Sequence, residues 1–165
     1  MKTLYIMCGP PGSGKTWFAT NTILNPKTAY IPRDEIRFNL VKEDEFYFSQ
    51  ERKVFKQFIQ LIQSALANES FRSVIADATH INMFSRKKLL NALNLSPYKN
   101  KRAIRIIPIW ICPPLKICLA QNNLREGRAR VPEKIITDIY NSCSHPKFDD
   151  IEYDFIIEVH NDLFY

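Results

Sequence analysis

The chain has 165 residues, of which 45% are hydrophobic and 24% are charged, with a formal net charge of +6. These values are those of an ordinary protein of one domain with a buried core. There is no run of 18 apolar residues, which excludes a membrane-spanning helix, and we expect no membrane partner. The four cysteines lack C-x-x-C spacing and lie in or beside apolar stretches. We therefore expect reduced thiols, a cytoplasmic protein and no zinc site.

Apolar runs alternate with helical patterns along the chain, which predicts an α/β fold with a mostly parallel sheet. Strands are predicted at about residues 3–8, 28–31, 73–76, 103–112 and 153–159. Helices are predicted at about residues 16–24, 35–39, 46–67, 83–93, 113–124 and 132–143. No repeat or linker divides the chain, so we predict a single domain over residues 1–165.

The octapeptide GPPGSGKT at residues 9–16 matches the phosphate-binding pattern G-x-x-x-x-G-K-[ST] at every fixed position. It follows an apolar strand and opens a helix, where such a loop surrounds nucleotide phosphates with backbone N–H groups. Lys15 is expected to reach the β- and γ-phosphates, and the Thr16 hydroxyl to bind Mg²⁺. The residues of this phosphate loop expected to hold the donor are Gly12, Ser13, Gly14, Lys15 and Thr16.

Asp34 follows the second predicted strand, and ligands of open α/β sheets bind beyond the carboxyl ends of the strands. An alcohol acceptor is a poor nucleophile until a base takes its proton, and Asp34 is the best candidate for this base. Arg37, one helical turn later, shares the face of Asp34 and could hold an anionic acceptor. The structural alternative is that Asp34 only caps the helix at residues 35–39.

Asp77 ends the third predicted strand, where its carboxylate could hold a Mg²⁺-bound water or an acceptor hydroxyl, or serve a purely structural purpose. Either Asp34 or Asp77 could complete the Mg²⁺ site of Thr16 through water. Thr79 and His80 follow at the same strand end, and His80 could contact acceptor, phosphate or solvent. Arg86 is expected on the polar side of the next helix, within reach of the substrate.

Residues 82–132 contain eleven Lys/Arg and one acid, Glu126, which gives this block a formal charge of +10. A block this basic attracts polyanions, either nucleotide phosphates or a nucleic-acid backbone. The alternative is a solvated surface, above all for Lys87, Lys88, Lys99, Lys101 and Arg102. Residues 125–131, called the lid below, carry Arg125, Arg128 and Arg130. These arginines could fold over the donor phosphates and exclude water, or remain a solvated basic loop.

Four segments together resemble the polynucleotide 5′-kinase branch of the P-loop kinases, namely residues 9–16, 33–37, 75–80 and 122–132. The resemblance implies a three-layer α/β/α fold with a five-stranded parallel sheet in the order 2-3-1-4-5, with ATP and Mg²⁺ as cofactors. It also implies that Lys15 and Thr16 hold phosphates and Mg²⁺, and that Arg125 grips the donor. Asp34 would be the base for the 5′-hydroxyl end of DNA or RNA, and Arg37 would contact the neighbouring phosphate.

Two positions depart from this family pattern: His80 stands where asparagine is usual, and Gln121 where an arginine often precedes Asn122.

Taken together, the motifs and the basic block predict a 5′-hydroxyl polynucleotide kinase, with two alternatives. One is a kinase for a small or sugar-containing acceptor, including relatives of the zeta toxins. The other is a nucleotide-binding module without transfer activity. A GTPase switch is disfavoured because the chain lacks the N/T-K-x-D guanine motif.

Overall fold

The computed structural model describes residues 1–42, 45–95 and 104–160, and its centre is a parallel sheet. The five strands lie in the order β2-β3-β1-β4-β5, as predicted. Their bounds are β1 Lys2–Cys8, β2 Thr28–Pro32, β3 Ser73–Asp77, β4 Ile104–Trp110 and β5 Ile157–Glu158. Because all strands are parallel, their carboxyl ends meet at one edge of the sheet, which is where the candidate site lies.

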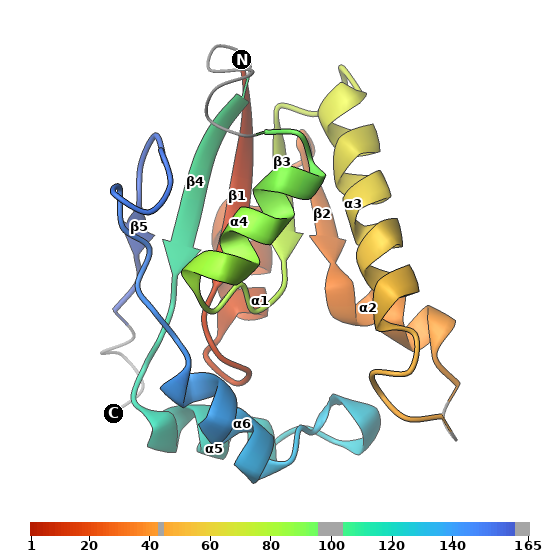
Figure 1. Ribbon diagram of the computed structural model, residues 1–165, viewed down its shortest axis with the longest axis vertical. Helices are drawn as coiled ribbons and strands as arrows, with labels where there is room; N and C mark the ends of the chain where they lie inside the picture. Colours follow the sequence, from red (N-terminus) through yellow and green to blue (C-terminus); the bar gives the residue numbers. More distant parts are fainter. Residues whose placement is uncertain (43–44, 96–103, 161–165) are drawn as a thin grey trace.

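Helices cover both faces of this sheet and give the predicted three layers. In Figure 1, α3 and α4 lie in front of the sheet and α1 behind it, while α5 and α6 lie beneath the carboxyl ends of the strands. The α-helices are α1 Lys15–Phe18, α2 Arg33–Leu40, α3 Glu51–Ala67, α4 Met83–Ala92, α5 Leu115–Asn123 and α6 Glu133–Asn141. None of the helices in the described ranges is long and apolar enough to cross a membrane.

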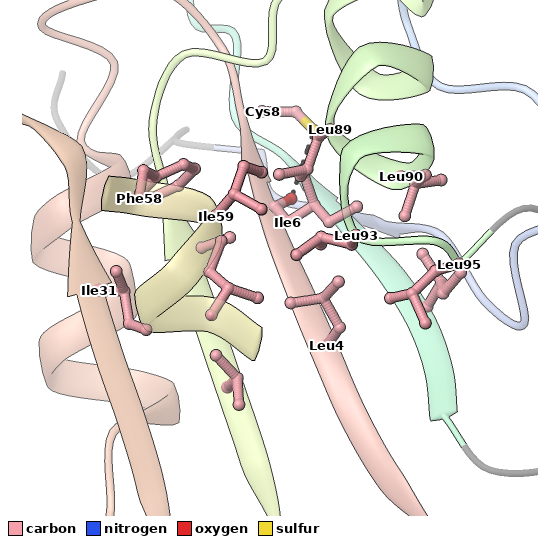
Figure 2. Packing of buried hydrophobic residues seen from close by; sticks show 14 of the residues in the cluster. Leu4, Ile6, Cys8, Ile31, Phe58, Ile59, Leu89, Leu90, Leu93 and Leu95 are labelled. Atoms are coloured by element: carbon pink, nitrogen blue, oxygen red, sulfur yellow. Dashed lines mark hydrogen bonds between the residues drawn. The ribbon is translucent and has the colours of Figure 1, made fainter. Parts of the chain in front are cut away.

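The strands form because their apolar side chains can be buried on both faces at once. Along β1, Leu4, Ile6 and Cys8 belong to the larger hydrophobic cluster, which packs against α3 and α4 (Figure 2). Met7 points the other way and joins a smaller cluster that includes Ala19. Successive side chains of a strand face opposite sides, so this alternation fixes β1 at the centre of the sheet.

Several predicted boundaries differ from the structure. The first helix has only four α-helical residues and continues as a π-helix at Ala19–Ile23. The helix predicted from residue 46 begins at Glu51, because residues 47–50 form a turn. The fifth strand is shorter than predicted, because Asp154 bonds Ile106 through both its backbone N–H and its side chain instead of continuing the ladder. Residue 103 of the predicted fourth strand lies outside the described residues.

Candidate active site at the carboxyl edge of the sheet

The phosphate loop joins β1 to α1, and its shape depends on glycines. Gly12 has a φ of +77°, in the left-handed region that favours glycine. A Cβ atom added to Gly12 would overlap the carbonyl oxygen of Cys118 in α5, and one added to Gly9 would overlap that of Ile111 after β4. The loop is therefore packed directly against the segment that leads into the lid.

Lys15 lies inside the curve of this loop, with only 8% of its surface exposed. Its Nζ donates to the carbonyl oxygen of Pro10 at 2.7 Å and lies 3.3 Å from the Ser13 hydroxyl oxygen. Burial lowers the pKa of the Lys15 ammonium group, the charge of Asp77 opposes this shift, and the positive charge of Arg125 adds to it. The group is thus poorly solvated, and no carboxylate among the described residues forms an ion pair with it. In this state an anionic phosphate would stabilise its charge.

Thr16 and Asp77 lie together at the ends of the loop and of β3. The Thr16 hydroxyl donates to Oδ2 of Asp77 at 2.9 Å, and the Tyr30 hydroxyl donates to the same oxygen at 2.6 Å. Burial and the charge of Asp77 raise the pKa of Tyr30, so its hydroxyl remains a proton donor. A threonine hydroxyl beside a carboxylate is the oxygen donor set that Mg²⁺ binds, with waters and phosphate oxygens completing its octahedron. These residues therefore fit a Mg²⁺ site, and they favour Asp77 over Asp34 as its carboxylate.

Asp34 lies in the first turn of α2, with 66% of its side chain exposed. Helix α2 begins at Arg33 with Pro32 as its N-cap, so the alternative in which Asp34 caps the helix is wrong. Oδ1 of Asp34 accepts from Nη1 of Arg37 at 2.5 Å and from the Tyr47 hydroxyl at 3.2 Å. Among the described residues, Oδ2 accepts no hydrogen bond, so this oxygen is available to accept one.

Arg37 is only 6% exposed, and its guanidinium is already engaged. Besides Asp34, it donates to Oε2 of Glu51 at 2.9 Å, and it lies over the rings of Tyr47 and Phe48 at 4.7 and 5.4 Å from their centroids. Glu51 also pairs with Arg33. Arg37 therefore fixes the orientation of Asp34, while two carboxylates neutralise much of its own charge.

The three lid arginines have different partners. Arg125 donates to the carbonyl oxygen of Ala129 at 3.5 Å and lines a pocket together with phosphate-loop residues. Nη2 of Arg128 donates to the carbonyl oxygen of Val41 at 2.7 Å, and Arg130 donates to Asn123 at 3.0 Å. A pocket of about 240 Å³ opens where the loop meets the lid. Its lining consists of loop residues 12 and 14–16 together with Trp17, Gln121 and Arg125.

The predicted substrate residues after β3 are mostly turned into the protein. The carbonyl oxygen of Thr79 accepts from the N–H of Gly9 at 2.8 Å, which ties this segment to the phosphate loop. His80 is 4% exposed and stacks on Phe58, so the alternative in which it contacts solvent is wrong. Burial, reinforced by nearby positive charges, lowers the pKa of His80 to about 3, and its ring is neutral near pH 7.

Arg86 is fully buried, and its expected place on the polar side of α4 is wrong. It donates to the carbonyl oxygens of His80 and Ser144 at 3.1 and 3.0 Å and to the Tyr153 hydroxyl at 3.1 Å. A helical pattern cannot reveal this, because these partners lie in distant segments.

Lys87 and Lys88 are exposed as expected. The other surface lysines and arginine named for this block, Lys99, Lys101 and Arg102, lie outside the described residues.

The sequence alone did not reveal four contributors to the site, which are Trp17, Tyr30, Tyr47 and Glu51. Tyr30 is central, because its hydroxyl bonds the Asp77 carboxylate. Parallel pairing of β2 with β3 places Tyr30 opposite Ile75, two residues before Asp77, and this pairing was the available signal. Glu51 offered no signal, since its contact with Arg37 depends on the turn before α3.

Comparison with known proteins identifies the family and the fold. A model of the protein family AAA_33, described as an AAA domain, matches residues 4–146. The chain is similar to the structure of a fungal RNA kinase, with a TM-score of 0.63 and 15% identity over 100% of this chain and 78% of that chain. No curated protein sequence matches it significantly.

Two further solved structures share the fold. One belongs to the Pnkp1/Rnl/Hen1 RNA repair complex, with a TM-score of 0.65 and 20% identity over 86% of this chain and 43% of that chain. The other is a sugar kinase from Janibacter sp. HTCC2649, with a TM-score of 0.61 and 11% identity over 96% of this chain and 85% of that chain. The family model spans most of the chain, and the sheet order is that of these kinases, so the protein belongs to the AAA_33 family and has the P-loop kinase fold.

Proposed function

We propose that this P-loop kinase transfers the γ-phosphate of ATP to the 5′-hydroxyl end of DNA or RNA. One observation carries the proposal: the phosphate loop, the Thr16–Asp77 pair, Arg125 and the exposed carboxylate of Asp34 all lie at one edge of the sheet. The first three provide what a triphosphate donor needs. Asp34 provides a base, which a module that only binds nucleotides would not require.

The donor half of the reaction depends on charge and position. Lys15, held by the loop, would bind the β- and γ-phosphates, and Arg125 would approach them from the lid. When bound at Thr16 and Asp77, Mg²⁺ would neutralise part of the charge on the phosphates. Each of these groups stabilises the transferring phosphoryl group without taking part in covalent chemistry.

The acceptor half depends on Asp34. Its free Oδ2 would take the proton of the acceptor hydroxyl as that oxygen forms a bond to the γ-phosphorus. The bond between the γ-phosphorus and the bridging oxygen breaks, and ADP leaves with that oxygen. Arg37 and Tyr47 both bond Oδ1, so they would hold the carboxylate in a fixed orientation during the transfer.

Two features support a polynucleotide acceptor. The basic block of residues 82–132 carries a formal charge of +10, and a phosphate backbone is attracted to such a block. The similar structures include an RNA kinase and a component of an RNA repair complex. A second candidate is a small or sugar-containing acceptor, favoured by the two carboxylates that neutralise Arg37 and by the similar sugar kinase.

The proposal is tested by incubating the protein with Mg²⁺, γ-labelled ATP and a panel of acceptors. The panel contains 5′-hydroxyl DNA, 5′-hydroxyl RNA, nucleosides, simple sugars and UDP-sugars. We expect label on the oligonucleotides. Strong labelling of a small acceptor with none on any oligonucleotide would replace the proposal with the second candidate.

Asp34→Asn is expected to reduce transfer by about 100-fold or more, because general-base catalysis typically contributes 10²–10⁴-fold. ATP binding, measured by calorimetry, should remain near that of the unaltered protein. Glu35→Gln is the matched control, since Glu35 is an exposed carboxylate in the same helical turn. Near-normal turnover in Asp34→Asn would show that Asp34 is not the base.

A further inference from the structure

The pocket beside the phosphate loop has two chemically different parts. Lys15, Thr16 and Arg125 suit phosphates and Mg²⁺, whereas Trp17 and Gln121 carry no charge. The uncharged part lies next to the loop residues that would hold the donor phosphates. This location is suitable for the nucleoside portion of the donor, which must leave the loop as the phosphates enter it.

Trp17 is unusually exposed for its size, with 60% of its surface accessible. Its neighbour in the same helical segment, Ala19, is fully buried against the sheet, so Trp17 points away from the core. The carbonyl oxygen of Trp17 accepts from the Asn21 side chain at 2.8 Å and from the Thr20 hydroxyl at 3.3 Å. These bonds fix the turn that carries the indole, and the ring belongs to neither hydrophobic cluster of the described residues.

We propose that Trp17 forms the nucleoside subsite of the donor, with its indole stacked on the base or ribose and Gln121 at the rim. The inference rests on the proposed use of a nucleoside triphosphate as donor. Stacking uses the flat face of a base, which every nucleobase has, and it does not read the hydrogen-bonding edges. The subsite therefore holds ATP, GTP, CTP and UTP with similar affinity.

The experiment measures binding of each ligand to the full-length protein by calorimetry with Mg²⁺ and without an acceptor. Trp17→Ala is expected to weaken ATP binding about tenfold, within the range that base–aromatic stacking contributes on alanine substitution. Tripolyphosphate, which has phosphates but no nucleoside, should bind both proteins equally. Trp17→Phe should retain most of the ATP affinity. Phe84→Ala is the matched control, because Phe84 is 75% exposed on α4 and does not line the pocket.

Unchanged ATP affinity in Trp17→Ala would overturn the subsite. Equal weakening of ATP and tripolyphosphate would also overturn it, because Trp17 would then only support the loop. A preference above about a hundredfold for one base would contradict stacking as the means of recognition, since only an edge-reading site discriminates so strongly. If ATP binds through Trp17 but no acceptor is phosphorylated, the subsite stands and the proposed function fails. If ATP does not bind at all, both fail.

Discussion

His80 lies where the candidate site meets the core, and its environment differs from that of a solvent-exposed histidine. Its ring stacks on Phe58 with 6.0 Å between centroids, and its backbone has a φ of +35°. Among the described residues, its Nε2 atom is buried without a hydrogen-bond partner. His80 therefore acts as a neutral core side chain, and its effect on the protein should depend on pH.

The first prediction at this scale concerns stability in mild acid. The pKa of His80 in the folded protein is about 3, whereas the same group in the unfolded chain titrates near its ordinary pKa of 6.5. Between these values the unfolded chain binds a proton that the folded protein does not, so stability falls as pH decreases. The loss is at most about 1.4 kcal/mol for each pH unit below about 6.5.

Urea unfolding at pH 7, 6 and 5 measures this effect. His80→Asn removes the titrating group, and asparagine tolerates a positive φ, so its free energy of unfolding should change less over this interval. The urea unfolding curve of the variant at pH 7 is the control, because it shows whether the variant is folded. Equal pH dependence in both proteins would mean that His80 is not buried as described.

Some site residues could be predicted individually and others could not. Lys15, Thr16 and Asp34 were found because a loop motif or a strand end fixes their positions. Asp77 was also found, but its role was left open, because the sequence does not show that the hydroxyl groups of Thr16 and Tyr30 both donate to its Oδ2. Arg86 was misplaced, because it begins a run of three basic residues in a helix, and such a run gives no sign that its first member is buried.

At the scale of elements, the lid is attached to the rest of the protein through Asn122. This side chain is fully buried at the end of α5. Its Nδ2 donates to the carbonyl oxygen of Val131 at 2.8 Å, and its Oδ1 accepts from the N–H of Val131 at 2.9 Å. The two bonds hold the two ends of the lid together, and we expect them to help keep Arg125 in position.

Asn122→Ala is expected to destabilise the protein by about 1–3 kcal/mol, because it leaves backbone groups of Val131 without partners. It should also raise the KM for ATP several-fold, because Arg125 loses its fixed position. Asn123→Ala is the matched control, since Asn123 is an exposed neighbour that bonds Glu133 and Arg130. Loss of stability with an unchanged KM for ATP would mean that the closed base of the lid does not position Arg125.

Elements with strong apolar patterns were predicted well, and those that depend on distant contacts were not. Strands β1 to β4 and most of α3 follow from buried residues at regular spacing. The predicted start of α3 was wrong, because Arg37 stacks on Tyr47 and Phe48 and thereby shapes the turn before this helix. The predicted length of the fifth strand was wrong, because the side chain of Asp154 accepts the hydrogen bond from the Ile106 N–H that a strand partner would otherwise accept.

At the scale of the whole molecule, charge is unevenly distributed along the chain. The block of residues 82–132 has a formal charge of +10, although the net charge of the protein is only +6. When such a block neutralises the phosphates of a polynucleotide, counterions are released from the polynucleotide. Its binding therefore weakens as salt is added. A neutral sugar would release none. The response to salt therefore distinguishes the two candidate acceptors.

The most direct measurement is transfer from γ-labelled ATP to one single-stranded oligonucleotide, supplied with either a 5′-hydroxyl or a 5′-phosphate, between 50 and 200 mM salt. We predict label on the 5′-hydroxyl form alone, with the KM for the oligonucleotide rising about tenfold over this range if two or three phosphates are contacted. The KM for ATP, determined in the same reactions, is the control for donor binding. Labelling of neither form, while a small sugar-containing acceptor is phosphorylated independently of salt, would contradict the account.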